Sequence, residues 1–194
     1  PAIFVVHAAR LVDRRKRLRV GLDKHGLHNW THIEKFDGDA ISPEAVSCFF
    51  GPWKSRIGGR KCCNRLSSVL KPHWAFFTIV DQELPNALIL EDDLTFPRPV
   101  LGKDFTRQLN QVVPQLRNCD LVRVGPLAVA YLISNTGARK MLNYSLKIGG
   151  VKIMNPQDWQ MDEVGRTKTA HFKVCEGPKY FDHYGHGANH GGGS

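Results

Sequence analysis

The sequence predicts an α/β fold with a mixed, mostly parallel central sheet flanked by helices. Short apolar runs alternate with helical patterns along the chain, as expected when helices cover a sheet built from successive strands. The apolar run Ala87–Leu90 is short and unbroken, which is typical of a strand buried on both faces. With 194 residues, 42% of them hydrophobic, the chain is long enough for a domain with a substantial core.

Composition narrows the function less than the motifs do. A net charge of +9 favours polyanions or phosphorylated ligands without choosing between them, and no apolar stretch approaches the roughly 18 residues of a membrane span. Basic residues are not interleaved with aromatic ones, as a nucleic-acid groove requires, so we expect no nucleic-acid partner. Five cysteines show no metal-ligand spacing, and their odd number fits free thiols or two bridges with one thiol left over. The compartment, secretory-pathway lumen or bacterial-type cytoplasm, stays open.

The N-terminal segment predicts a strand followed by a basic helix. Ile3–Val6 is a β-type apolar run, and Ala8–Gly26 places leucines on one helical stripe, although Gly21 inside it signals an early end. Basic side chains crowd this helix: Arg10, Arg14, Arg15, Lys16, Arg17 and Arg19. Such a helix can accept phosphate at its N-terminus, and the alternative is a solvated basic face. A GxGxxG motif is absent, so a dinucleotide site is unsupported.

A strand, a long loop and a helix are predicted next. Trp30–Phe36 alternates like a strand, and Ile41–Arg65 is irregular enough to form a binding loop. Leu66–Gln82 carries a helical pattern interrupted by Pro72, so we expect the main helix to begin near that proline or to kink there. His73 then lies at the start of this helix, where a histidine is either structural or close to a site.

Three consecutive carboxylates, Glu91, Asp92 and Asp93, follow the buried run Ala87–Leu90. Open α/β sheets bind ligands at the carboxyl ends of their strands. Adjacent like charges repel one another and lose hydration when partly buried, so something must offset them. A divalent cation, Mn²⁺ or Mg²⁺, would do so, because such cations take one or two carboxylates together with substrate phosphates. The alternative is a charged turn that opens into solvent.

The second half of the chain predicts one more helix, two strands and a capped helix. Asp104–Leu116 has a helical pattern, whereas Asp120–Val124 and Ala128–Ile133 are strands joined by a very short link. Ser134 suits the N-cap of a helix over Thr136–Leu142. We expect one domain over residues 1–170 and a flexible Gly- and His-rich tail over residues 171–194.

Several separated motifs, in this order, resemble glycosyltransferase family 25, which includes bacterial lipooligosaccharide galactosyltransferases and procollagen galactosyltransferases. The carboxylate strand and the segment Tyr131–Lys140 are the most specific. The weaker matches are the opening strand with Arg14 and Arg15, Phe36-Asp37-Gly38, the helix segment Leu66–Trp74 with its Ser and His residues, and Pro156-Gln157-Asp158.

The resemblance implies a GT-A-like fold and an enzyme that moves a sugar, galactose in this family, from a UDP-sugar to a glycan or protein hydroxyl. It implies a Mn²⁺ ion held by Asp93 with help from Glu91 or Asp92. A metal so held acts as a Lewis acid on the leaving diphosphate. Arg14 or Arg15 would add a fixed positive charge to the pyrophosphate.

The family's enzymes are thought to invert the anomeric carbon, which requires a base for the acceptor proton. Asp158 is the candidate, with Asp162 and Glu163 as substitutes, although a helix N-terminal carboxylate is an equal alternative. His73 would shape the donor pocket or contact the acidic cluster. His183 is either a further metal ligand or part of the tail.

Three departures from the family pattern stand out. His7-Ala8 replaces the usual Asn-Leu, Lys71-Pro72 precedes His73, and the link Gly125-Pro126-Leu127 lacks the family's longer insertion. The main rival hypothesis is therefore a catalytically inactive relative that serves as a binding or adhesion module. A carboxylate-metal phosphohydrolase is a further alternative, but its Lys/Thr constellation is missing.

Overall fold

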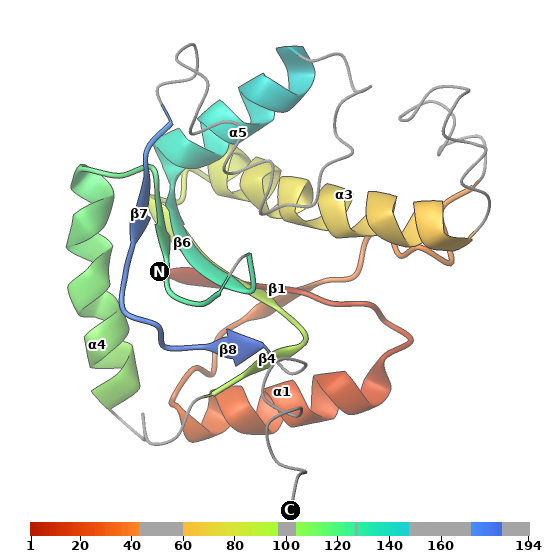
Figure 1. Ribbon diagram of the computed structural model, residues 1–194, viewed down its shortest axis with the longest axis horizontal. Helices are drawn as coiled ribbons and strands as arrows, with labels where there is room; N and C mark the ends of the chain where they lie inside the picture. The colour runs from red at the N-terminus through yellow and green to blue at the C-terminus, as the bar shows by residue number, and fades with distance from the viewer. Residues whose placement is uncertain (43–59, 97–103, 127, 148–171, 184–194) are drawn as a thin grey trace, which may run out of the picture.

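The protein has an α/β fold in which one sheet is covered by helices on both faces (Figure 1). The computed structural model describes residues 1–42, 60–96, 104–126, 128–147 and 172–183. The elements in chain order are β1 (Ala2–Val6), α1 (Val12–Lys24), β2 (Thr31–Ile33), α3 (Arg60–Asp81), β3 (Asn86–Glu91), β4 (Leu94–Thr95), α4 (Asp104–Val112), the 3-10 helix η2 (Val113–Arg117), β5 (Leu121–Arg123), β6 (Ala130–Ser134), α5 (Asn135–Lys147), β7 (Val174–Glu176) and β8 (Asp182–His183).

The main sheet is mixed, as predicted. Its six strands have the order β2-β1-β3-β6-β5-β7. β1 runs parallel to both β2 and β3, and β5 runs parallel to β7, whereas β6 is antiparallel to its neighbours β3 and β5. The parallel pairing of β1 with β3 places their carboxyl ends at the same edge of the sheet.

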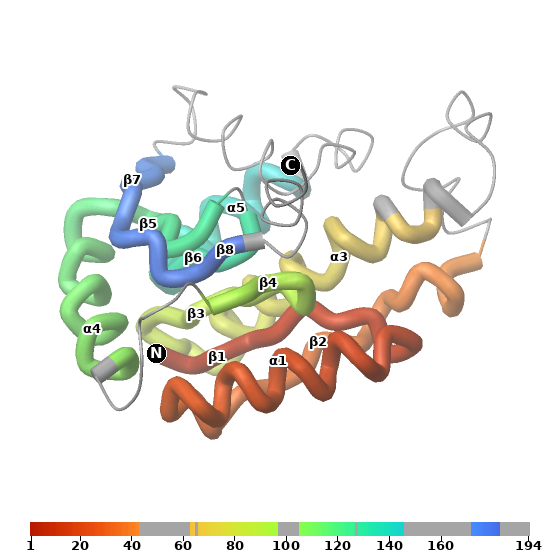
Figure 2. Tube along the Cα trace, turned by 60° about the horizontal axis from the view of Figure 1, so that its bottom comes forward, coloured from red at the N-terminus to blue at the C-terminus, as the bar shows by residue number. Residues whose placement is uncertain are grey.

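Strand β3 is buried on both faces, which confirms the prediction from its unbroken apolar run. Ala87 and Ile89 belong to the core formed with α3 and α5, whereas Leu88 and Leu90 belong to the core formed with α1 and α4. Figure 2 shows the two helix layers on opposite sides of the sheet. Because a fully buried Leu or Ile stabilises the fold by about 1.5–3 kcal/mol, this strand is a rigid platform for the residues that follow it.

Two helices continue through residues that local sequence rules treat as helix breakers. α3 begins at Arg60 and continues through Pro72, so the prediction that it begins near Pro72 is wrong. Leu66 before the proline and Phe76 after it are both fully buried, and this packing offsets the roughly 3 kcal/mol that an interior proline costs. α1 likewise continues through Gly21, where a side chain would meet the Phe96 ring at 2.5 Å. Gly21 therefore provides room for Phe96 and does not end the helix.

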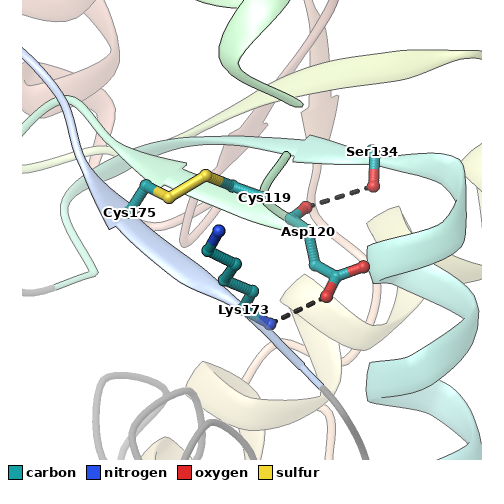
Figure 3. The surroundings of a disulfide bond; sticks show 5 residues. All are labelled: Cys119, Asp120, Ser134, Lys173 and Cys175. Carbon is teal, nitrogen blue, oxygen red and sulfur yellow. Dashed lines mark hydrogen bonds between the residues drawn. A yellow bond between two sulfur atoms is a disulfide. The ribbon is translucent and has the colours of Figure 1, made fainter. Parts of the chain in front are cut away.

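Residues 172–183 form part of the fold, although the sequence placed them in a flexible tail. β7 pairs with β5, β8 pairs with β4, and Phe172 and Phe181 are buried. A disulfide joins Cys175 in β7 to Cys119, two residues before β5 (Figure 3). The sequence had left open whether the cysteines are bridged or free. Cys119 and Cys175 form a bridge, and within the described residues Cys63 has a free thiol. The remainder of the predicted tail, 184–194, lies outside the described residues.

In the parts of the chain that the structure describes, no helix is both long enough and apolar enough to cross a membrane.

Candidate functional site

A cavity of about 440 Å³ opens at the shared carboxyl edge of β1 and β3. Its walls come from the end of β1 and the loop after it, the start of α1, the middle of α3 and the turn after β3. The lining residues are Val6, His7, Ala8, Arg10, Leu11, Arg14, Gly38, Asn64, Ser67, Ser68, Lys71, Glu91, Asp92 and Asp93. Three acidic residues and three Arg or Lys residues therefore line the same cavity.

Asp92 accepts hydrogen bonds from three different residues. Its Oδ2 accepts hydrogen bonds from Nδ1 of His7 at 2.9 Å and from the backbone N–H of Ala8 at 3.2 Å. Its Oδ1 accepts a hydrogen bond from Nη1 of Arg14 at 3.1 Å. The His7 side chain is 0% exposed and that of Asp92 is 11% exposed. The carboxylate therefore ties the end of β3 to the β1–α1 loop and to α1.

Arg14 lies between two of the carboxylates. The same Nη1 atom that donates to Asp92 is 3.7 Å from Oδ2 of Asp93. The guanidinium thus neutralises part of the charge of the acidic turn, for which the sequence predicted either a bound cation or exposure to solvent. Charge-assisted hydrogen bonds of this kind contribute about 1.5–3 kcal/mol each when partly buried.

Lys71 supports the cavity wall from α3, and the sequence analysis did not select it. Its side chain is 3% exposed, and its ammonium donates to the backbone carbonyl of His7 and to Oδ1 of Asp37. Oδ2 of Asp37 in turn accepts a hydrogen bond from the N–H of Ala9 at 2.9 Å. The sequence did contain a signal for this role, because Lys71 lies within an otherwise apolar helical pattern. A lysine buried in such a pattern needs a partner.

Only some of the predicted site residues line the cavity. Arg14 joins Glu91, Asp92 and Asp93 at the cavity, whereas Arg15 donates to Oε1 of Glu34 at 2.7 Å. Asp158 and its substitutes Asp162 and Glu163 lie outside the described residues, as does the side chain of His183.

His73 faces α5. Its Nε2 is 2.6 Å from Oγ of Ser145, and its Nδ1 donates to the carbonyl of Val69 at 2.8 Å. Burial lowers the pKa of His73, and the hydrogen bond to Val69 opposes that shift only in part. The neutral ring therefore braces α3 against α5.

A second histidine, His32, packs against the buried His7 ring with 5.0 Å between ring centroids. Burial lowers the pKa of His32 to about 4, and the positive charge of Arg15 acts in the same direction. His32 is therefore neutral at physiological pH. Nε2 of His7 and both ring nitrogens of His32 are buried without a hydrogen-bond partner among the described residues.

The carboxylates set limits on how a cation could be held. Within the described ranges, no group of three or more His, Cys, Asp or Glu side chains is arranged to hold a metal ion. Asp92 already bonds to His7, Ala8 and Arg14. Glu91 and Asp93 supply hard oxygen atoms on the same wall, which fits a two-carboxylate site that substrate phosphates complete.

The comparisons with known proteins leave the family open. The chain matches no protein-family model, and no curated protein matches its sequence. The resemblance to glycosyltransferase family 25 therefore remains a prediction from the motifs.

Proposed function

We propose that the protein is a metal-dependent glycosyltransferase with a GT-A-like fold, similar to family 25. In this proposal it moves a sugar, galactose by the resemblance, from a UDP-sugar to a glycan or protein hydroxyl with inversion. The cavity carries the proposal, because it brings Arg14, Glu91 and Asp93 together at the carboxyl edge of two parallel strands. That edge is where open α/β sheets bind nucleotides.

The roles of the residues follow from the charges of the reaction. Transfer breaks the bond between the anomeric carbon and the donor diphosphate and forms a bond to the acceptor oxygen. Arg14 would hold the diphosphate, whose negative charge grows as the bond breaks. Glu91 and Asp93 would hold Mn²⁺ or Mg²⁺, which acts as a Lewis acid when bound. The acceptor proton needs a base, and Asp158 keeps that proposed role from the resemblance.

Calorimetry with UDP and Mn²⁺ tests the proposal. Wild-type protein should bind UDP with an affinity that rises with Mn²⁺, and Asp93→Asn should remove that increase. Asp23→Asn is the matched control, because Asp23 is on α1, is about half exposed and pairs with Arg19 away from the cavity. UDP binding that needs no metal and survives Asp93→Asn would contradict the proposal. Absence of UDP binding by folded wild-type protein would favour the inactive binding module.

A further inference from the structure

We propose that Asp92 is a positioning residue, which together with His7 holds Arg14 in the cavity. The inference rests on the proposed function, in which Glu91 and Asp93 hold the cation. Its basis is that the Asp92 carboxylate accepts three hydrogen bonds from protein groups, one of them from Arg14.

The carboxylate of Asp92 is committed to protein groups on both of its oxygens. One oxygen accepts from His7 and Ala8, and the other accepts from Arg14. A cation ligated by Asp92 would have to share a carboxylate that already accepts three hydrogen bonds. If it displaced the imidazole, the fully buried ring of His7 would lose the one hydrogen bond that it makes among the described residues. Leaving a buried polar group unsatisfied is unfavourable.

The consequence of this bonding is the placement of Arg14. Its Nη1 is held 3.1 Å from Asp92 and remains 3.7 Å from Asp93, so the guanidinium stays on the cavity wall next to the proposed cation ligand. Loss of the Asp92 charge would release this contact, and a long Arg side chain loses conformational entropy when it has to be fixed again. A preorganised Arg14 therefore favours binding of an anionic diphosphate.

The loop that carries His7 has a second, independent anchor. Lys71 bonds to the His7 carbonyl, and Asp37 accepts from the N–H of Ala9. Because these bonds do not involve Asp92, the loop should keep its fold when only the charge of Asp92 is removed. Asp92→Asn therefore tests positioning of Arg14 rather than folding.

The experiment measures UDP affinity with and without Mn²⁺ for Asp92→Asn, Asp93→Asn, Arg14→Gln and the double variant of residues 14 and 92. Asp92→Asn and Arg14→Gln should each weaken UDP binding about tenfold in both conditions, since one charge-assisted hydrogen bond is worth at least that much. The affinity ratio between the two conditions should stay at the wild-type value. The double variant should be no weaker than Arg14→Gln alone, because Asp92 acts through Arg14.

Asp93→Asn, in contrast to Asp92→Asn, should remove the increase in UDP affinity that Mn²⁺ causes. Arg19→Gln, at a well-exposed position of α1, is the charge-matched control for Arg14 and should bind like wild type. The inference is overturned if Asp92→Asn removes the Mn²⁺ effect, if it leaves UDP affinity unchanged, or if its effect adds fully to that of Arg14→Gln.

A ligand-free measurement separates this inference from the proposed function. If wild-type protein binds no UDP in either condition, the proposed function fails. The ¹⁵N NMR signals of the His7 ring then decide the positioning role. The positioning role is supported if Nδ1 is protonated in wild type and its ¹⁵N signal shifts in Asp92→Asn. Ring signals that are the same in both proteins overturn it.

Discussion

Replacing both Cys119 and Cys175 by Ala should destabilise the protein by about 4 kcal/mol. The bridge spans a sequence separation of 56 residues. In the chain-entropy description, opening a loop of that size restores about 14 cal/mol/K to the unfolded chain, which is about 4 kcal/mol at 25 °C. This is a large part of the 5–15 kcal/mol typical of a folded domain.

The native fold should survive the loss of the bridge. Phe172 and Phe181 are buried on either side of Cys175, and β7 keeps its ladder with β5. Urea unfolding followed by circular dichroism is the assay. Wild-type protein with a reductant should unfold at the same midpoint as the double variant, with a steeper slope than the oxidised protein because the open chain exposes more surface.

Cys63→Ser provides the control. Cys63 has a free thiol and makes a long contact to the carbonyl of Ile41. Its substitution should change stability by no more than about 0.5 kcal/mol in either redox state. A loss below about 1 kcal/mol in the double variant would refute the reasoning, because the bridge would then impose no constraint on the unfolded chain.

Three further perturbations test other parts of the structure. His32 has a folded pKa of about 4 against an ordinary value of 6.5, so stability should fall as pH drops from 6.5 to 4. The full difference is about 3 kcal/mol, which partial exposure of the ring reduces to about 1–2 kcal/mol, and His32→Gln should flatten this slope in urea unfolding at each pH. Gly137→Ala should cost about 1–3 kcal/mol, because the new Cβ would lie 2.4 Å from the backbone oxygen of Asp120; an unchanged midpoint would contradict that contact. Lys71→Met should cost about 2–4 kcal/mol by leaving Asp37 without its cation, and adding Asp37→Asn should recover part of the loss.

Local sequence signals predicted the elements whose causes are local. The run Ala87–Leu90 is apolar at every position, and such a strand has to be buried on both faces wherever it pairs. Ser134 was predicted as an N-cap, and its Oγ accepts the N–H of Gly137 at 3.0 Å. Each of these interactions spans only a few residues, so neighbouring positions contain the information needed.

The errors arose where distant residues override local rules. Gly21 is a helix breaker by propensity, but its lack of a side chain serves Phe96, which is far away in sequence. Short, polar strands such as β7 carry little periodicity, and their pairing depends on a partner and on the Cys119–Cys175 bridge. A glycine or a cysteine in the sequence shows that a constraint exists without showing which segment imposes it.

In the candidate site, too, local sequence predicted the position of the side chains but not their distant partners. The sequence placed Glu91, Asp92 and Asp93 at a strand end, and the cavity is there. It assigned the metal first to Asp93, but it could not identify the partner of Asp92, because the bond from Asp92 to His7 joins positions 85 residues apart. His7 was noted only as a departure from the family pattern, although it is the buried partner that distinguishes Asp92 from Asp93.

A bound cation would have less negative charge to neutralise at the acidic turn than the sequence alone suggests. Three adjacent carboxylates need positive charge, and Arg14 together with the Ala8 N–H already supplies it at Asp92. The proposed cation ligands are Glu91 and Asp93, and Arg14 is close to the second of them. Two carboxylates beside one arginine bind a divalent ion weakly unless anionic phosphates complete its coordination shell. It follows that Mn²⁺ and UDP should each bind better in the presence of the other, by the same factor, since coupling between two ligands is reciprocal.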